Sequence, residues 1–125
     1  MQFTDKSESR NGPTRLPALT LLSLPVDDVL PQVLAALAAG RNAVLIAPPG
    51  AGKTTRVPPA LLAGLRPPGR IVMLEPRRVA ARAATRRMAM ENAWTVGEEV
   101  GYQIRFERRF KPSTPIVVVT EGILV

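Results

Sequence analysis

A short apolar run that leads into a glycine-rich loop and then into a helical pattern is the feature that most limits the fold of this chain. Residues 43–47 (AVLIA) are apolar, residues 48–53 carry two prolines and two glycines, and a helical pattern runs from about Lys53 to near Gly64. A continuous apolar run bounded by turn signals is typical of a buried strand. The segment therefore predicts a strand–loop–helix unit, from which α/β folds are built.

The same alternation continues along the chain and indicates an α/β fold with a mainly parallel sheet flanked by helices. Residues 1–20 are expected to form a flexible tail, because their start is polar and contains Asn-Gly-Pro, and residues 21–125 to form one domain. Pro31 suits the first turn of a helix, so the first helix is expected to begin near it. The sequence predicts helices over residues 26–39 and 77–91, a second buried strand over residues 70–74, and further strands over residues 101–106 and 116–120.

The composition excludes several kinds of chemistry. The chain has 125 residues and neither cysteine nor histidine, which excludes disulfides, Cys/His zinc sites and Ser-His-Asp triads. Residues 1–40 hold three basic and four acidic residues, whereas residues 41–125 hold 14 basic and six acidic ones. The later part therefore has a net charge of +8, against +7 for the whole chain. A basic domain indicates a polyanionic partner, although a solvated basic surface gives the same balance. No apolar stretch reaches the roughly 18 residues of a membrane-spanning helix, and a cytoplasmic location is expected.

The loop after the first apolar run has the residue types that a triphosphate requires. Gly50 and Gly52 let the backbone approach phosphates without a Cβ clash, and N–H groups at the start of the following helix attract anions. Lys53 is expected to contact the β- and γ-phosphates, and the Thr54 hydroxyl to ligate Mg²⁺. The loop follows the pattern GxxxxGK[ST], except that Ala47 stands at the first glycine position.

Two arginines directly follow the strand predicted over residues 70–74. Arg77 and Arg78 come after its carboxyl end, where ligands of open α/β sheets collect, and are therefore candidates for binding phosphate. A solvated helix face is the alternative for Arg78, because its helical arc also carries Arg82 and Arg86.

The helix that begins at these arginines is rich in alanine. At about 100° per residue, Thr85 falls on the arc of the arginines. Arg87 falls on the opposite arc, and its guanidinium either extends out of this apolar face into water or stacks on a base. The apolar arc is expected to pack against a sheet and consists of Val79, Ala80, Ala81, Ala83, Ala84, Met88 and Met90.

The last predicted strand runs into Thr120, Glu121 and Gly122. Thr120 is a candidate donor to a phosphate, with the N-cap of a following helix as the alternative. Upstream of this strand, aromatic residues alternate with arginines, as in base-stacking surfaces, but ordinary strand packing is the simpler explanation. The residues concerned are Tyr102, Phe106 and Phe110, with Arg105, Arg108 and Arg109.

Four segments, in this order, resemble motifs of the DEAH/RHA-type superfamily 2 helicases. APPGAGKTT (residues 47–55) resembles motif I, LEPRR with its Ala/Arg helix resembles motif Ia, GEEVGYQIRFERR resembles the segment between motifs Ia and Ib, and VVVTEGIL (residues 117–124) resembles motif Ib. The forms LEPRR and TEGIL are most similar to those of the bacterial HrpB type. The resemblance covers about residues 24–125. It implies the first RecA-like domain of an ATP-dependent helicase acting on nucleic acid, RNA more than DNA.

The resemblance also implies roles for individual residues, with Lys53 and Thr54 as catalytic residues and Thr54 as the Mg²⁺ ligand. In related DEAH proteins an arginine late in the helix after motif Ia stacks on adenine, and Arg87 has that register. The implied phosphate site consists of Pro49, Gly50, Ala51, Gly52, Lys53, Thr54 and Thr55. The implied contacts to nucleic acid are Arg77, Arg78, Thr120, Glu121 and Gly122.

ATP hydrolysis requires a further acidic pair, the Walker B motif, in which Asp holds Mg²⁺ and Glu positions the attacking water. The family carries this pair downstream of motif Ib, and the chain reaches Val125 before such a strand. We therefore expect a partial RecA-like domain, truncated before the Walker B strand, that binds ATP without helicase turnover. The expected partner is the rest of the helicase chain, including a second RecA-like domain. Two alternatives are another P-loop enzyme such as a kinase, which would need an acceptor site and a lid, and a basic RNA-binding module.

Overall fold

The structure is a computed structural model of the chain, and it describes residues 2–3, 24–48, 50 and 52–124. The chain divides into two compact units, Met1–Leu65 and Arg66–Val125. The tail predicted over residues 1–20 lies outside the described residues, apart from β1 (Gln2–Phe3). In the described part of the chain, no helix is long and apolar enough to cross a membrane.

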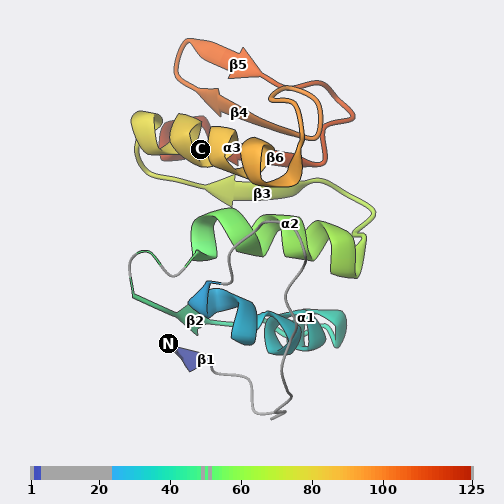
Figure 1. Cartoon of the computed structure of the whole chain (residues 1–125). Coiled ribbons are helices and arrows are strands. Elements are labelled where there is room, and N and C mark those ends of the chain that lie inside the picture. Colours follow the sequence, from blue (N-terminus) through green and yellow to red (C-terminus); the bar gives the residue numbers. More distant parts are fainter. Residues whose placement is uncertain (1, 4–23, 49, 51, 125) are drawn as a thin grey trace. The chain divides into compact units, whose positions relative to one another are not determined.

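The first unit contains two packed helices and a short antiparallel ladder (Figure 1). Its elements are β1, the 3-10 helix η1 (Pro25–Asp28), α1 (Leu30–Ala38), β2 (Leu45–Ile46) and α2 (Lys53–Leu65). The Asp27 carboxylate accepts hydrogen bonds from the Leu24 N–H at 2.8 Å and from the Arg56 guanidinium at 2.7 Å. Asp27 therefore joins η1 to α2, next to the loop from which α2 begins.

Two expectations for the first unit need correction. The helix predicted over residues 26–39 is divided at Val29 into η1 and α1, and α1 begins beside Pro31, where the missing N–H costs no helical hydrogen bond. The strand predicted over residues 43–47 forms at β2, but it is not buried, since Ile46 is 53% exposed. Its partner β1 has two residues, and so short a ladder leaves much of the strand in water.

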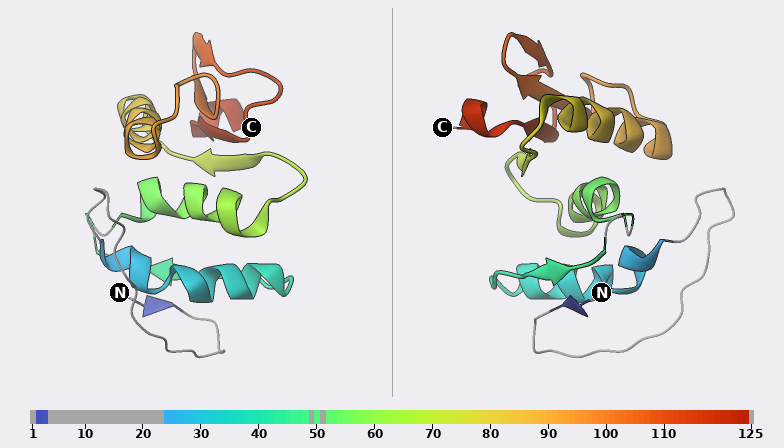
Figure 2. Two further views of the ribbon diagram at one scale, coloured as in Figure 1. Left: turned by 45° about the vertical axis from the view of Figure 1, so that its right-hand side comes forward. Right: turned by 90° about the vertical axis from the view of Figure 1, so that its left-hand side faces the viewer.

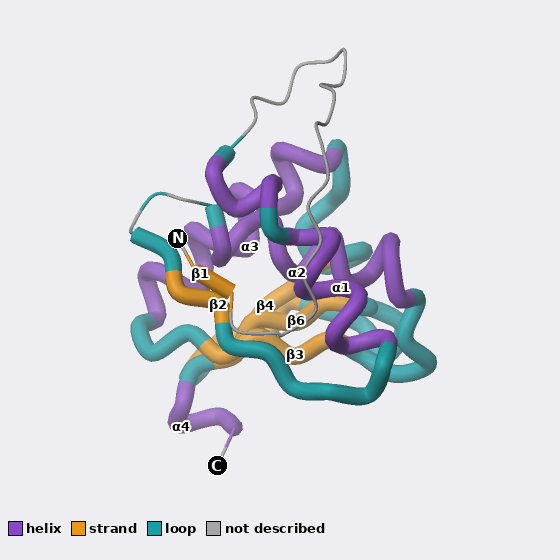
Figure 3. Tube along the Cα trace, turned by 90° about the horizontal axis from the view of Figure 1, so that it is seen from below, coloured by secondary structure: helices purple, strands orange, loops and turns teal. Residues whose placement is uncertain are grey.

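The second unit contains a four-stranded sheet in the order β3-β6-β4-β5. Its elements are β3 (Ile71–Leu74), α3 (Arg78–Asn92), β4 (Val100–Ile104), β5 (Glu107–Arg109), β6 (Ile116–Val119) and α4 (Glu121–Leu124). β6 pairs in parallel with β3 and with β4, and β5 pairs antiparallel with β4 at the far edge. Figures 1 and 2 show α3 lying along this sheet, where it contacts β4 and β6, and Figure 3 shows β3, β6 and β4 side by side. The predicted α/β fold with a mainly parallel sheet is thereby confirmed.

Burial differs between the central and the outer strands of this sheet. All four residues of β6, which lies within the strand predicted over residues 116–120, are buried. β3 lies at one edge of the sheet, and its residues Val72 and Leu74 are 52% and 45% exposed, so the prediction of a buried strand is wrong there. The difference follows from strand order, because α3 packs over β4 and β6 rather than over the edge strand β3.

The strand predicted over residues 101–106 ends at Ile104 and turns back as β5, a strand that the sequence pattern does not predict. Arg105 and Phe106 form the turn between β4 and β5, with Phe106 at a φ of +69°. Such two-residue turns usually carry Asn or Gly, and this one carries neither, so the turn leaves no signal in the sequence.

The buried face of α3 is also rotated from the predicted one. Thr85, placed on the arc of the arginines, is fully buried, because its hydroxyl donates to the Ala81 carbonyl at 2.9 Å and so needs no water. Val79 and Met90, predicted to pack against the sheet, are 75% and 71% exposed, and Ala83 is exposed as well. The helix therefore buries Ala81, Ala84, Thr85, Met88 and Ala89.

A polar network fixes the β4–β5 hairpin to α3. The hydroxyl of Tyr102 on β4 donates to one carboxylate oxygen of Glu107 on β5, and the other oxygen lies 3.5 Å from the Arg82 guanidinium on α3. Burial, followed by the hydrogen bond to Glu107 and its charge, raises the pKa of Tyr102 above the ordinary value of 10.0. The neutral hydroxyl of Tyr102 donates the hydrogen bond to Glu107, so the neutral form of this tyrosine stabilises the hairpin.

Tyr102 is the sole tyrosine of the chain, so ultraviolet absorbance of tyrosinate reports its titration alone. We expect a midpoint above pH 10 in the folded chain. Because the folded pKa is raised, the stabilisation is fully present below pH 10 and is lost as the pH rises through the folded pKa. Tyr102→Phe should lower the free energy of unfolding at neutral pH by about 1–2 kcal/mol. Glu107→Gln should move the midpoint down, whereas Glu98→Gln, which removes a carboxylate paired with Lys111, should not. A folded-chain midpoint at or below 10 would contradict this account.

Candidate nucleotide and nucleic-acid sites

The loop between β2 and α2 contains two glycines with positive φ. Gly50 and Gly52 have φ values of +83° and +97°, a region that strains residues with a side chain. A Cβ built on Gly52 would lie 2.7 Å from Leu24 Cδ1, whereas a Cβ on Gly50 would meet nothing within 4 Å. A side chain at position 52 would thus displace the end of Leu24 as well as strain φ, whereas the space beside Gly50 is open. The other two predicted loop residues, Pro49 and Ala51, lie outside the described residues.

Lys53 is the first residue of α2 and is exposed. Its ammonium group donates to the Ala47 carbonyl oxygen at 3.1 Å, so the side chain bends back across the loop instead of extending into solvent. One carbonyl satisfies one of the three donors of an ammonium group, and among the described residues the other two have no partner, so they are available to the oxygens of a phosphate. Thr54 is also exposed and Thr55 is half-buried, in the first helical turn, where backbone N–H groups lack intrahelical acceptors.

The side chains at this loop fit Mg²⁺ held by few protein ligands. In the described part of the chain, no group of three or more Asp, Glu, His or Cys side chains is placed to hold a metal ion. Mg²⁺ commonly keeps several waters and binds through one or two protein groups and the phosphates of its substrate. The exposed Thr54 hydroxyl suits that role, and its assignment as the Mg²⁺ ligand stays a prediction.

The predicted nucleic-acid contacts come together at the carboxyl ends of the parallel strands in the second unit's sheet. β3, β6 and β4 are parallel, so their carboxyl ends lie at the same edge, with Leu74 paired to Val119. Arg77 and Arg78 follow β3 at this edge, and residues 120–122 follow β6. The structure thus unites residues that are more than 40 positions apart in the sequence, while their binding of nucleic acid stays a prediction.

The two arginines at this edge are available to an anion. Arg77 is the N-cap residue of α3 and Arg78 its first residue, and both are exposed. Among the described residues, neither guanidinium has a hydrogen-bond or ion-pair partner, and the first turn of α3 contains no acid. Two cations at the positive end of a helix dipole are unfavourable, so a bound anion would be stabilised by both the arginines and the dipole.

The residues after β6 differ from one another. Thr120 is 7% exposed and directly precedes α4, the position of the N-cap that the sequence left as an alternative. Its backbone N–H donates to the Gln103 carbonyl at 3.4 Å, which ties the end of β6 to β4. Glu121 and Gly122 are exposed. Of the predicted contacts after β6, these two have surface that a ligand can reach.

Arg87 extends into water, which was one of the two alternatives for its position. Its side chain is 58% exposed, and its guanidinium lies 2.8 Å from the Glu91 carboxylate, one helical turn further on. The Glu91 side chain of this pair is 8% exposed, so Arg87 is the partner that water reaches. Arg87 belongs to the second unit and the glycine-rich loop to the first, and its stacking on adenine stays a prediction.

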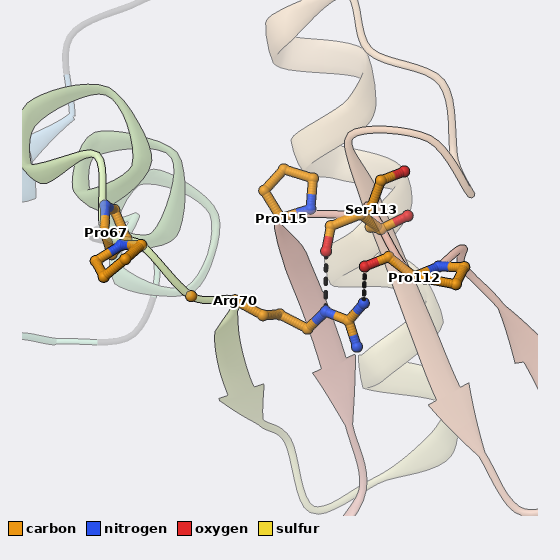
Figure 4. A pocket seen from close by; sticks show the side chains of 8 residues that line it. Pro67, Arg70, Pro112, Ser113 and Pro115 are labelled. Carbon is orange, nitrogen blue, oxygen red and sulfur yellow. Dashed lines mark hydrogen bonds between the residues drawn. The ribbon is translucent and has the colours of Figure 1, made fainter.

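Arg70 has a structural role that the sequence analysis missed. A pocket of about 430 Å³ is lined by residues 67–70 and 112–115, and Arg70 spans it (Figure 4). The guanidinium donates to the Thr114, Pro112 and Lys111 carbonyls at 2.9, 2.7 and 3.1 Å. Its hydrogen bonds bind the loop before β6, at the amino ends of the strands and away from Arg77. No local signal marks this arginine, because its partners lie 41–44 residues further along the chain.

Comparison with known proteins identifies related helicases. No family model matches the chain. The chain is 46% identical to the ATP-dependent RNA helicase HrpB of Escherichia coli over 102 residues, which are 82% of this chain and 13% of that protein. It is 40% identical to the ATP-dependent RNA helicase DHX33 of Drosophila melanogaster over 104 residues, 82% of this chain and 15% of that protein. The chain thus spans a small part of the length of these relatives.

Solved structures agree with the sequence comparison. A crystal structure of the E. coli DEAH/RHA helicase HrpB matches with a TM-score of 0.73 and 44% identity, covering 82% of this chain and 13% of that one. A second, of the E. coli DExH-box NTPase HrpB, matches with a TM-score of 0.72 and 42% identity over 86% of this chain and 13% of that one. In sequence and in fold this chain is therefore similar to one segment of the HrpB-type DEAH/RHA helicases, the family that its four motifs resemble.

Proposed function

We propose that this chain is the part of an ATP-dependent RNA helicase that binds the phosphates of ATP and the backbone of RNA. The observation that carries the proposal is the loop from Gly50 to Thr54, in which two glycines with positive φ lead into a helix that begins with an exposed lysine and an exposed threonine. In this proposal the loop N–H groups bind the phosphates, Lys53 neutralises the β- and γ-phosphates, and Thr54 ligates Mg²⁺.

The second part of the proposal concerns RNA. The exposed Arg77 and Arg78 bind phosphates of the RNA backbone at the carboxyl ends of β3 and β6, together with Glu121 and Gly122 through their backbone N–H groups. Support comes from the absence of partners for both guanidinium groups among the described residues and from the relatives, which are named RNA helicases.

The third part of the proposal concerns turnover. Hydrolysis of ATP requires two carboxylates that hold Mg²⁺ and position water, and no Asp-Glu pair follows an apolar strand within these 125 residues. We therefore propose that these residues bind ATP and RNA, and that hydrolysis and unwinding need further helicase sequence, including a second RecA-like domain. The chain's 13% share of HrpB's length is consistent with this division.

Nucleotide binding is tested with Lys53→Ala and a fluorescent ATP analogue in the presence of Mg²⁺. We expect affinity to fall about tenfold or more, because a charge-assisted contact to phosphate is lost. Thr54→Ala should remove the dependence of binding on Mg²⁺. Lys111→Ala removes the same charge from the second unit and should leave affinity within about twofold. Equal binding by the Lys53→Ala variant and the unaltered chain would refute the nucleotide site.

RNA binding is tested with Arg77→Ala plus Arg78→Ala and a single-stranded oligonucleotide at several salt concentrations. Each lost phosphate contact should reduce the slope of log K against log salt by about 0.7, so the double variant should lose about 1.4. The matched control is Arg66→Ala plus Lys111→Ala, which removes two charges that precede the amino ends of β3 and β6. If both double variants change affinity and slope equally, binding is a property of net charge and the proposed RNA site is wrong.

A further inference from the structure

Residues 24–28, which include the 3-10 helix η1, pack directly against the last glycine of the glycine-rich loop. A Cβ built on Gly52 would lie 2.7 Å from Leu24 Cδ1 and 3.2 Å from Val26 Cγ1. Val26 is fully buried, so apolar side chains rather than water cover this side of Gly52. The glycine directly before α2 thus contacts a segment that lies more than 20 positions earlier in the sequence and outside the pattern GxxxxGK[ST].

A polar contact ties the same segment to the first turn of α2. One carboxylate oxygen of Asp27 accepts a hydrogen bond from the Arg56 guanidinium at 2.7 Å and another from the Leu24 N–H at 2.8 Å. The side chains of Arg56 and Asp27 are 14% and 29% exposed, so solvent screens this pair less than it screens an exposed one. Hydrogen bonds to a charged acceptor are also stronger than neutral ones. Asp27 therefore holds both the start of η1 and the start of α2.

These contacts form a closed ring around the last glycine of the loop. The Arg56 N–H donates to the Gly52 carbonyl at 2.8 Å. The Arg56 guanidinium binds Asp27, whose carboxylate holds the Leu24 N–H. The side chains of Leu24 and Val26 then lead back to Gly52. Gly52 is thereby restrained through its carbonyl and through the groups packed at its Cα, directly before the two residues that begin α2.

A phosphate site built from backbone N–H groups depends on the directions in which these groups point. Glycine has the widest choice of backbone conformations, so a loop with two glycines loses conformational entropy when a ligand fixes it. The ring of contacts restrains Gly52 before any ligand binds, together with the first turn of α2, whose N–H groups lack intrahelical acceptors. Less entropy is then lost on binding, which favours affinity.

We propose that Asp27 is a positioning residue of the nucleotide site, which holds Gly52 and the first turn of α2 in the conformation that binds phosphates. The proposal rests on the nucleotide-binding function proposed above and adds to it a residue outside the glycine-rich loop that acts through Arg56 and Leu24. Charge alone predicts the opposite effect, because a carboxylate near a phosphate site repels the anion. The sign of the change in affinity on removing Asp27 therefore separates positioning from charge.

The test measures how tightly the full chain binds two probes, the Mg²⁺ complexes of a fluorescent ATP analogue and of inorganic tripolyphosphate, the second by competition. We expect Asp27→Ala to weaken both probes by the same factor, at least about threefold. Asp27→Asn keeps an acceptor oxygen but loses the charge, so it should weaken both by a smaller factor. The matched control is Asp28→Asn, which removes the same charge from the adjacent residue. Asp28 is exposed and has no partner among the described residues, so neither probe should bind more weakly.

A spectroscopic signature separates positioning from a loss of folding. Without ligand, the ¹⁵N–¹H signal of Gly52 should move in Asp27→Ala, move less in Asp27→Asn and stay in place in Asp28→Asn. Circular dichroism and RNA affinity should match those of the unaltered chain, because Arg77 and Arg78 belong to the other unit. If Asp27→Ala loses helical signal, Asp27→Asn carries the test, since charge alone predicts that this variant binds phosphate more tightly.

Three results overturn the inference. If both Asp27 variants bind the probes as tightly as the unaltered chain or more tightly, while Lys53→Ala weakens them, the nucleotide site stands and η1 does not position it. If Asp27→Ala weakens the ATP analogue but not tripolyphosphate, Asp27 acts on the nucleoside and not on the phosphate loop. If Asp28→Asn weakens both probes as much as Asp27→Asn does, the effect does not come from the contact with Arg56. If the unaltered chain binds neither probe, the proposed nucleotide function fails and the positioning role fails with it.

Discussion

The parallel pairing of β6 with both β3 and β4 is the constraint on which the second unit depends. β6 is buried along its whole length and brings strands from two distant parts of the sequence into one register. Because all three strands point the same way, whatever follows each of them arrives at the same edge. The exposed arginines after β3, the turn after β6 and the hairpin after β4 are therefore neighbours as a consequence of strand direction, before any ligand is considered.

The first unit places a positively charged side chain next to a loop that contains two glycines. Gly50 and Gly52 adopt positive φ values that strain residues with a side chain, and the ammonium group of Lys53 donates to the Ala47 carbonyl. In each unit, basic side chains at the start of a helix have N–H donors without a partner among the described residues. These side chains are Lys53 at α2 and Arg77 and Arg78 at α3. Donors of this kind can bind the oxygens of a phosphate.

Local sequence patterns predicted the positions of the helices and strands better than they predicted which side chains are buried. The Gly-Lys-Thr sequence placed the start of α2 at Lys53, and the alanine-rich run placed α3 to within one residue at each end. The exposure of Val72 on β3 could not be predicted, because it depends on strand order, and neither could the burial of Thr85, which depends on a carbonyl that satisfies its hydroxyl. The hydrogen bonds of Arg70 to three carbonyls could likewise not be predicted, because the tertiary fold brings these carbonyls to Arg70.

The most direct test of the account follows backbone amide signals of the ¹⁵N-labelled chain by NMR during two titrations. A Mg²⁺ complex of a non-hydrolysable ATP analogue should shift Gly50, Gly52, Lys53 and Thr54. Single-stranded RNA should instead shift Arg77, Arg78, Thr120, Glu121 and Gly122 at the carboxyl ends of β3 and β6. RNA-induced shifts that concentrate at the amino ends of the strands, around Arg70, Ser113 and Thr114, would contradict the proposed RNA site. Shifts that spread evenly over the basic surface would contradict it as well.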